Sequence, residues 1–235
     1  MIKAVMFDLD GTLLGQKIAS SNVLKQLYLE NKDYFKDITQ KDFLDTWSKV
    51  AKKNVQEFFK GEISFEDKVI MQIQDLFDSF SYKMLKSETK EIFDKLLPIY
   101  ENSIILYDDV IPCLEWLKRN KYRLGIITNG HSKDQRDKLI KYNLQKFFSP
   151  IVVSGDIGYA KPNKEIFLEC IRLLDLPPQS ILYIGDLIEM DVLGANNVGI
   201  KGIWLNRHNL EESNYDIISI RSLKELKTLI KNDIN

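Results

Sequence analysis

Short, nearly continuous apolar runs that stop at polar residues constrain the fold of this chain most strongly. The first such run covers residues 2–7 and stops at Asp8. Runs of this kind are typical of parallel strands that are buried on both faces of a sheet. Further runs follow in the second half of the chain, at residues 123–128, 151–154, 181–184 and, with one glycine inside, 200–205. The sequence therefore predicts five strands of the parallel type.

Helical periodicity fills the intervals between these runs from about residue 109 onward. Residues 109–119, 132–142 and 163–174 carry apolar side chains at helical spacing, and residues 222–231 form an amphipathic closing segment. Asn163 is a suitable N-cap for the third of these helices. Alternating strands and helices predict an α/β fold, here a Rossmann-like parallel sheet with helices on both faces.

The segment at residues 15–107 breaks this alternation. It is too long for a loop in a compact domain, and its patterns are helical throughout. Thr39 is predicted to cap one helix whose apolar face extends from Phe43 to Phe59, and further helices are expected near 65–80 and 87–97, with Pro98 ending the last. We therefore expect an all-helical cap at residues 15–107, inserted into a catalytic core made of residues 1–14 and 108–235.

The composition excludes several classes of function. The 235 residues include 33 Lys and Arg against 34 Asp and Glu, so the net charge of -1 gives no reason to expect a nucleic-acid polymer or an anionic membrane surface as partner. No apolar run approaches the roughly 20 residues that a membrane-spanning helix needs. The N-terminus lacks a signal-peptide pattern. We expect a soluble, cytoplasmic protein.

Polar residues follow four of the predicted strands. They are Asp8 with Asp10, Thr128-Asn129-Gly130, Lys161-Pro162, and Gly185-Asp186 with Asp191. Each group alone has an ordinary explanation, such as a turn, a surface lysine or acids at a helix N-terminus. Because ligands of open α/β sheets bind outside the carboxyl ends of the strands, we expect these groups to converge.

The residue types in these groups suit one kind of chemistry. Two carboxylates in a turn form a hard oxygen site that suits Mg²⁺, and Asp186 is a natural third ligand. The Thr128 hydroxyl and exposed backbone N–H groups can bind phosphoryl oxygens. Lys161, next to a proline, can hold a positive charge in the same site. The sequence thus predicts a site for a phosphate group and a divalent cation.

In their order along the chain, these groups resemble the motifs of the haloacid dehalogenase (HAD) superfamily of hydrolases. Asp8-Leu9-Asp10-Gly11-Thr12 matches the first motif, Thr128 the second, Lys161-Pro162 the third, and Gly185-Asp186 with Asp191 the fourth. The position of the insertion resembles the subgroup whose helical C1-type cap lies between the first two motifs. The resemblance covers essentially the whole chain.

The resemblance implies a phosphatase that forms a phospho-aspartate. Asp8 would be the nucleophile and a metal ligand, and Asp10 would be the acid–base partner whose backbone carbonyl also binds the metal. Asp186 would complete the metal site. Thr128, Asn129 and Lys161 would bind the phosphate, and Lys161 would also neutralise charge. Asp191 would support Lys161 or a metal-bound water. The cofactor implied is Mg²⁺.

Other functions use similar residues. A haloacid dehalogenase shares the nucleophile but needs no metal and as a rule lacks the second aspartate, which is present here as Asp10. A phosphoglucomutase-like phosphotransferase shares every catalytic residue, and only the fate of the phospho-aspartate separates it. A phospho-accepting signalling module would be much shorter, and a catalytically silent binding protein would more typically have lost Asp8 or Asp10. A phosphatase is therefore the leading interpretation.

The substrate is constrained less tightly. Three segments resemble the pyrimidine 5′-nucleotidase and N-acylneuraminate-9-phosphatase members of the family. They are the residues around Thr128, residues 161–167 and Trp204-Leu205-Asn206. A small phosphate ester, either a nucleotide or a sugar phosphate, is the expected substrate, acted on by a monomer or homodimer. The roles of Lys17, His131 and Glu189 stay open.

Overall fold

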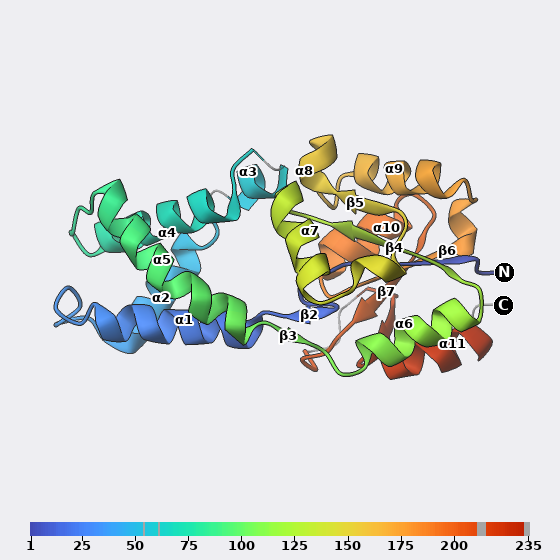
Figure 1. Ribbon diagram of the computed structural model, residues 1–235, viewed down its shortest axis with the longest axis horizontal. Coiled ribbons are helices and arrows are strands. Elements are labelled where there is room, and N and C mark those ends of the chain that lie inside the picture. Colours follow the sequence, from blue (N-terminus) through green and yellow to red (C-terminus); the bar gives the residue numbers. More distant parts are fainter. Residues whose placement is uncertain (54, 61, 211–214, 233–235) are drawn as a thin grey trace.

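The computed structural model describes residues 1–53, 55–60, 62–210 and 215–232. Figure 1 shows two parts, a sheet flanked by helices and a group of helices beside it. The N-terminus lies on the side of the sheet that faces away from the separate helices. No helix in the described ranges combines the length and apolar character that crossing a bilayer requires.

The central sheet is parallel and six-stranded, with the order β5-β4-β1-β6-β7-β8. Its strands are β1 (Ala4–Phe7), β4 (Arg123–Thr128), β5 (Ile151–Val153), β6 (Ile181–Gly185), β7 (Lys201–Leu205) and β8 (Ile218–Ile220). All pairings between neighbouring strands are parallel. The predicted α/β fold is confirmed, and β8 is a strand that the sequence patterns did not indicate.

Helices cover both faces of this sheet (Figure 1). They are α6 (Val110–Arg119), α7 (Ser132–Lys141), α8 (Ser154–Ile157), α9 (Lys164–Leu174), α10 (Gly194–Asn196) and α11 (Leu226–Asn232). Successive side chains of β1 point to opposite faces of the sheet. Val5 and Phe7 pack on the face covered by α6 and α11. Ala4 and Met6 pack on the face covered by α9 and α10. Asn163 caps α9 as predicted, with its side chain accepting a hydrogen bond from the Glu165 amide.

The inserted segment forms the cap helices, a name used here for α1 (Lys17–Glu30), α2 (Gln40–Val50), α3 (Val55–Lys60), α4 (Phe65–Ser79) and α5 (Lys86–Ser103). Thr39 caps α2 as predicted, since its hydroxyl accepts a hydrogen bond from the Asp42 amide. The cap helices have a buried cluster of their own, built around Phe35, Phe43 and Phe77.

Two predictions for the cap helices are wrong. The single helix expected from Thr39 to Phe59 is two helices, because α2 ends at Val50 and α3 begins at Val55. The helix expected to end at Pro98 continues to Ser103. Proline removes one backbone hydrogen bond from a helix, but α5 packs along α1 and against α4, and tertiary packing offsets that local cost.

The chain leaves and re-enters the core at one place. β2 (Leu14–Gly15) and β3 (Ile105–Leu106) pair antiparallel there, and the Tyr107 amide donates to the Leu13 carbonyl over 3.3 Å. The Arg207 guanidinium lies 4.0 Å from the Tyr107 ring centroid and donates to the Thr12 carbonyl over 3.0 Å. The division of the chain into a core and a cap at residues 14/15 and 107/108 stays a prediction.

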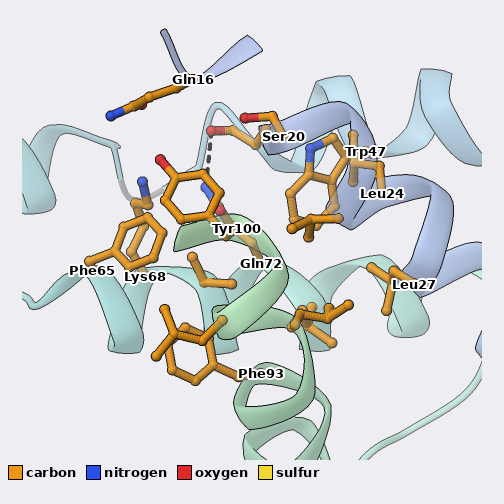
Figure 2. Close-up of a pocket in the computed structure, with 16 residues that line it drawn as sticks. Gln16, Ser20, Leu24, Leu27, Trp47, Phe65, Lys68, Gln72, Phe93 and Tyr100 are labelled. Atoms are coloured by element: carbon orange, nitrogen blue, oxygen red, sulfur yellow. Dashed lines mark hydrogen bonds between the residues drawn. The ribbon is translucent and has the colours of Figure 1, made fainter. Parts of the chain in front are cut away.

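The cap helices enclose a cavity of about 240 Å³ (Figure 2). Leu24, Trp47 and Phe93 contribute apolar walls, and Lys68 and Tyr100 contribute polar groups. Apart from the junction at β2 and β3, α3 contacts α8 of the core (Figure 1), and the Ser154 hydroxyl donates a hydrogen bond to the Phe59 carbonyl there. The inserted segment thus contacts the core at the junction and again at α8.

Gly125 in β4 gives a test of the core packing. A Cβ at this position would lie 2.3 Å from the Met6 Cε and 2.6 Å from the Pro150 carbonyl oxygen. The methionine side chain can move but the backbone oxygen cannot, so we expect Gly125→Ala to lower the free energy of unfolding by about 1–3 kcal/mol. Urea denaturation measures this value. Ser219→Ala, on the exposed side of β8, is the control and should stay within about 0.5 kcal/mol of wild type.

Candidate active site

The carboxyl ends of three adjacent strands bring the predicted polar groups together. Asp8 follows β1, Thr128 ends β4 and Asp186 follows β6, and these strands are neighbours in the order β4-β1-β6. The Asp8 amide donates to the Ile184 carbonyl over 2.9 Å, which extends the β1–β6 pairing and fixes the aspartate at the sheet edge. The predicted convergence is thus present in the fold.

A lysine lies at the centre of this group. The Lys161 Nζ is 2.6 Å from the Asp8 Oδ1, 2.7 Å from the Asp191 Oδ1 and 2.9 Å from the Tyr183 hydroxyl. Lys161, Asp8 and Asp191 are all buried. An ammonium at this depth is held by two carboxylates and one hydroxyl, so its three donors are all used.

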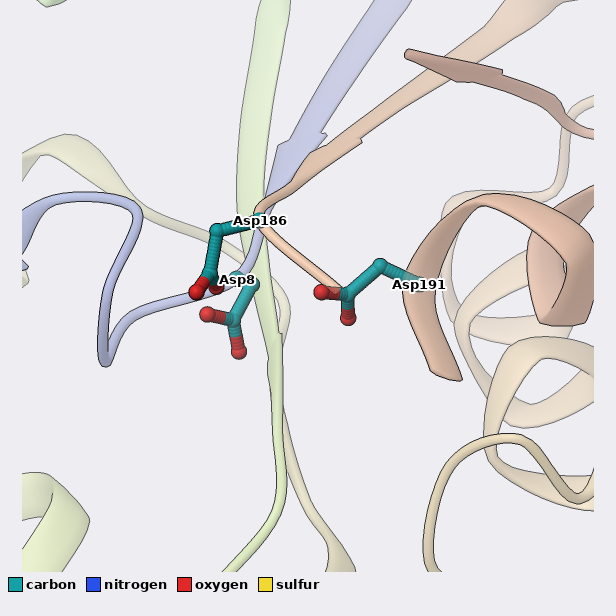
Figure 3. A group of neighbouring side chains, drawn as sticks. All are labelled: Asp8, Asp186 and Asp191. Atoms are coloured by element: carbon teal, nitrogen blue, oxygen red, sulfur yellow. The ribbon is translucent and has the colours of Figure 1, made fainter. Parts of the chain in front are cut away.

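Three carboxylates face one another around the lysine. Asp8, Asp186 and Asp191 each offer an oxygen such that the three atoms lie within 4.8 Å of one another (Figure 3). Asp186 is fixed through its backbone carbonyl, which accepts a 3.0 Å hydrogen bond from the Trp204 indole, and through the Thr12 hydroxyl at 3.3 Å from its Oδ1. The Asp191 Oδ2 accepts from the Leu187 amide over 2.9 Å.

Two glycines of the predicted motifs make this approach possible. A Cβ at Gly11 would lie 2.3 Å from an Asp186 carboxylate oxygen, and Gly11 also has a φ of 93°, which favours glycine. A Cβ at Gly185 would lie 2.2 Å from the Asp191 Cγ. The glycines beside the aspartates therefore provide the space into which the carboxylates fit.

The electrostatics of the site favour an added cation. Burial raises the pKa of Asp8 well above its ordinary value, against the opposing effect of Lys161, and the charges of Asp191 and Asp186 raise it further. Burial and Asp191 raise the pKa of Asp186 to about 6. Burial alone would lower the pKa of Lys161, but Asp191 and Asp8 raise it. Three carboxylates face a single ammonium here, so this donor set of hard oxygens fits a divalent cation such as Mg²⁺.

Asp10 lies apart from this cluster and has its own partners. Its Oδ2 accepts hydrogen bonds from the Gln135 amide over 3.0 Å and from the Lys138 ammonium over 2.6 Å. Its Oδ1 accepts from the Gln16 amide. The side chain is therefore held outside the group formed by Asp8, Asp186 and Asp191, and its predicted metal contact, through the backbone carbonyl, stays a prediction.

The predicted phosphate ligands lie beside Asp8 on the neighbouring strand. The Thr128 hydroxyl is buried and has no hydrogen-bond partner within the described ranges. Buried hydroxyls normally have a partner, so this one is available to a ligand. The Asn129 side chain is used differently, because it bonds both the amide and the carbonyl of Lys161, at 2.8 and 3.1 Å. Asn129 thus positions the lysine through its side chain.

Several residues of the site were missed by sequence reasoning. Tyr183 donates to the Ile127 carbonyl over 2.8 Å and lies 3.2 Å from the Asp191 Oδ1. The only indication of this role in the sequence was the hydroxyl of Tyr183 inside an otherwise apolar predicted strand. Gln135 and Lys138 are three residues apart and lie on one face of α7, but most residues of that helix are polar, so neither stood out in the sequence.

The three residues left open have distinct surroundings. Lys17 and Glu189 are exposed. His131 precedes α7, and its Nδ1 lies 3.6 Å from the Asp134 Oδ1. None of the three contacts the group formed by Asp8, Lys161, Asp186 and Asp191 through any hydrogen bond or ion pair seen in the described chain.

Comparison with known proteins places the chain in a family. A family model described as haloacid dehalogenase-like hydrolase matches residues 2–199. The chain therefore belongs to the haloacid dehalogenase-like hydrolases, which confirms the resemblance found in the motifs. A solved structure of a HAD phosphatase from Thermococcus onnurineus superimposes with a TM-score of 0.72 at 28% identity, covering 100% of both chains.

Curated relatives carry the names of phosphatases. The pyrimidine 5′-nucleotidase YjjG of Escherichia coli is 30% identical over 96% of each chain. The N-acylneuraminate-9-phosphatase of Mus musculus is 27% identical over 98% of this chain and 94% of that protein. A glyceraldehyde 3-phosphate phosphatase of Methanopyrus kandleri is 37% identical over 45% of this chain, and the match spans about half of that relative, 46%.

The crowded carboxylates make stability depend on pH. Folded Asp186 holds its proton up to a pKa of about 6, whereas the unfolded side chain releases it near its ordinary value of 3.8, so the folded state is penalised as pH rises through this interval. With a chelator present, we expect Asp186→Asn to raise the Tm at pH 7.5 by a few degrees, and the gain should shrink below pH 6.

Thermal denaturation between pH 4.5 and 8 measures this effect. Asp33→Asn is the control, since the Asp33 side chain is 94% exposed and the substitution should leave the Tm unchanged at every pH. A Tm for Asp186→Asn at or below that of wild type at pH 7.5 would contradict the repulsion described for Asp186.

Proposed function

We propose that the chain is a Mg²⁺-dependent phosphatase that hydrolyses a small phosphate ester through a phospho-aspartate on Asp8. One observation carries the proposal: Asp8 shares a buried site with Lys161 and two further carboxylates, while Asp10 is held separately beside it. The phosphatase names of the curated relatives support the same reaction. A bound Mg²⁺, held by Asp8 and Asp186, would offset the negative charge of the site and of the phosphate.

The first step uses the contacts of Asp8 and Lys161. A carboxylate oxygen of Asp8 attacks phosphorus, and the bond from phosphorus to the ester oxygen breaks. The Thr128 hydroxyl donates to a phosphoryl oxygen, and the fixed charge of the Lys161 ammonium lowers the repulsion between the Asp8 carboxylate and the phosphate. Asp10, in its protonated form, donates its proton to the leaving oxygen.

The second step reverses the role of Asp10. Its carboxylate accepts a proton from water, whose oxygen attacks phosphorus, and the bond to Asp8 breaks to release inorganic phosphate. The Gln135 and Lys138 donors, 3.0 and 2.6 Å from its Oδ2, hold this carboxylate in position. Asn129 and Tyr183 hold Lys161 in place through both steps.

Several finer statements belong to the proposal as well. A nucleotide or a sugar phosphate is the proposed substrate class, supported by the names of YjjG and the mouse relative. A cytoplasmic location and a monomeric or homodimeric state stay predictions. Solved haloacid dehalogenases share the fold at 16–22% identity, and that likeness concerns the fold alone.

Substitution of the nucleophile tests the reaction. With p-nitrophenyl phosphate and Mg²⁺, we expect Asp8→Asn to lower kcat by about three orders of magnitude or more, because an amide cannot form the phospho-enzyme.

A chelator should abolish wild-type activity, and Mg²⁺ should restore it. Mg²⁺ should also raise the Tm of wild type but not of Asp186→Asn, which reports metal binding without turnover.

The matched control for Asp8→Asn is Asp137→Asn, a half-exposed acid of α7 that pairs with Lys133. This variant should keep wild-type activity. Wild-type turnover no faster than that of Asp8→Asn would refute the phosphatase proposal. Formation of a phosphorylated product without release of inorganic phosphate would favour the phosphoglucomutase-like alternative.

Substitution of Asp10 tests the two-step mechanism. The leaving group of p-nitrophenyl phosphate departs without much help from an acid, whereas hydrolysis of the phospho-enzyme still needs a base. We therefore expect Asp10→Asn to release a burst of about one p-nitrophenol per active site and then to turn over slowly. Rapid-quench kinetics measure the burst. A slow linear phase with no burst would contradict a base role for Asp10 in the second step.

A further inference from the structure

The cap cavity lies next to the acid–base carboxylate. Gln16 lines the cavity and also donates to the Asp10 Oδ1. In Figure 2 the polar ends of Gln16, Lys68 and Tyr100 lie on the same side of the cavity. Because Gln16 on this side bonds Asp10, this side is the one that faces the core. A group that leaves phosphorus beside Asp10 therefore has the cavity directly in front of it.

The walls of the cavity define the size and character of an occupant. The volume of about 240 Å³ is below the roughly 300–1,000 Å³ of sites for drug-sized ligands, so one ring or a chain of similar size fits. Leu24, Trp47, Phe93 and Leu96 supply apolar surface. Phe65 and Tyr100 form a stacked pair with ring centroids 5.2 Å apart and an interplanar angle of 25°. These walls favour an apolar body over a sugar with many hydroxyls.

Lys68 is the cation of this cavity. Its Nζ lies 4.1 Å from the Phe58 ring centroid and 5.0 Å from that of Phe65. Across the described part of the chain, the ammonium makes neither a hydrogen bond nor an ion pair. Burial, and after it the charge of Lys138, lower the pKa of Lys68 to about 8. An ammonium in such surroundings gains free energy from an anionic partner.

Nearby acids are engaged elsewhere. Asp10 is paired with Lys138 at 2.6 Å. The Asp134 Oδ2 accepts a hydrogen bond from the Phe65 amide over 3.2 Å, and its Oδ1 lies 3.6 Å from the His131 Nδ1. These contacts also tie the start of α4 to α7, which places Lys68, three residues after Phe65, on the core side of the cap. Lys68 is thus available to a ligand that enters between cap and core.

We propose that the cap cavity holds the leaving group of the substrate and that Lys68 binds a carboxylate on that group. The inference rests on the proposed phosphatase function and replaces the nucleotide or sugar phosphate suggested by the relatives' names with another class of phosphate monoester. The preferred substrate is a phosphate monoester whose leaving group has an apolar body about one ring in size and a carboxylate. The charge of Lys161 acts on the phosphate and Lys68 binds the carboxylate, so two separate cations act on the two ends of one molecule.

A matched pair of aryl phosphates tests the assignment. Phenyl phosphate and 4-carboxyphenyl phosphate share the ring and differ in the carboxylate. For wild type with Mg²⁺, we expect kcat/KM to be higher for the carboxylated ester. Lys68→Met should lower the ratio of the two kcat/KM values about tenfold or more, mainly through the KM of the carboxylated ester, because a charge-assisted bond is lost. Lys68→Arg should keep part of the preference.

Lys41→Met is the control, because it removes the same charge from an exposed position at the start of α2. Its ratio should equal that of wild type. An unchanged ratio in Lys68→Met would overturn the proposal. An equal loss on both esters would also overturn it, because Lys68 would then act on the phosphate or on the fold.

Binding of the product separates this inference from the proposed function. Isothermal titration calorimetry with 4-hydroxybenzoate should give a Kd at least about tenfold weaker for Lys68→Met than for wild type. No turnover of either ester together with Lys68-dependent binding would refute the phosphatase proposal and leave the carboxylate site supported. Binding that does not depend on Lys68 would overturn the carboxylate site, whatever the activity.

Discussion

A buried ammonium surrounded by carboxylates is the interaction on which the rest of the site depends. Lys161 lies 2.6 and 2.7 Å from Asp8 and Asp191, and Asp186 adds a third acid to the same small volume. Bringing these charges out of water is costly unless they neutralise one another. The single positive charge of Lys161 cannot neutralise three carboxylates, so the folded site carries an excess of negative charge. In the proposed mechanism a bound Mg²⁺ would supply the missing positive charge, which the anionic phosphate of the substrate needs as well.

The sheet and its glycines make this crowding possible. β1 and β6 end side by side and deliver Asp8 and Asp186 to one edge, and the missing side chains of Gly11 and Gly185 leave the space that the carboxylates occupy. Asp10, only two residues beyond Asp8, is turned out of the cluster and bound by donors from α7. Two acids from one short turn therefore have different surroundings, as the proposed mechanism requires of a nucleophile and an acid–base group.

Much of the core was predictable because its signals are local. Buried strands appear as continuous apolar runs, and four motifs at their ends indicated Asp8, Thr128, Lys161 and Asp186. Tyr183 and Lys138 were missed because their roles depend on where a helix or strand lies in space, and nothing in their neighbours distinguishes them. Pro98 was misread for a related reason, since local propensity favours an end there and packing against α1 overrides it.

The junction at β2 and β3 has a consequence for how such a chain can diversify. Because the outgoing and returning segments pair with each other, Leu14 with Leu106 and Gly15 with Ile105, the whole helical insertion is topologically a single loop between β1 and β4. A helical unit of a different length or sequence can be spliced at this point without altering the register of either strand. The core that holds Asp8 and the helices that line the cavity can therefore change separately.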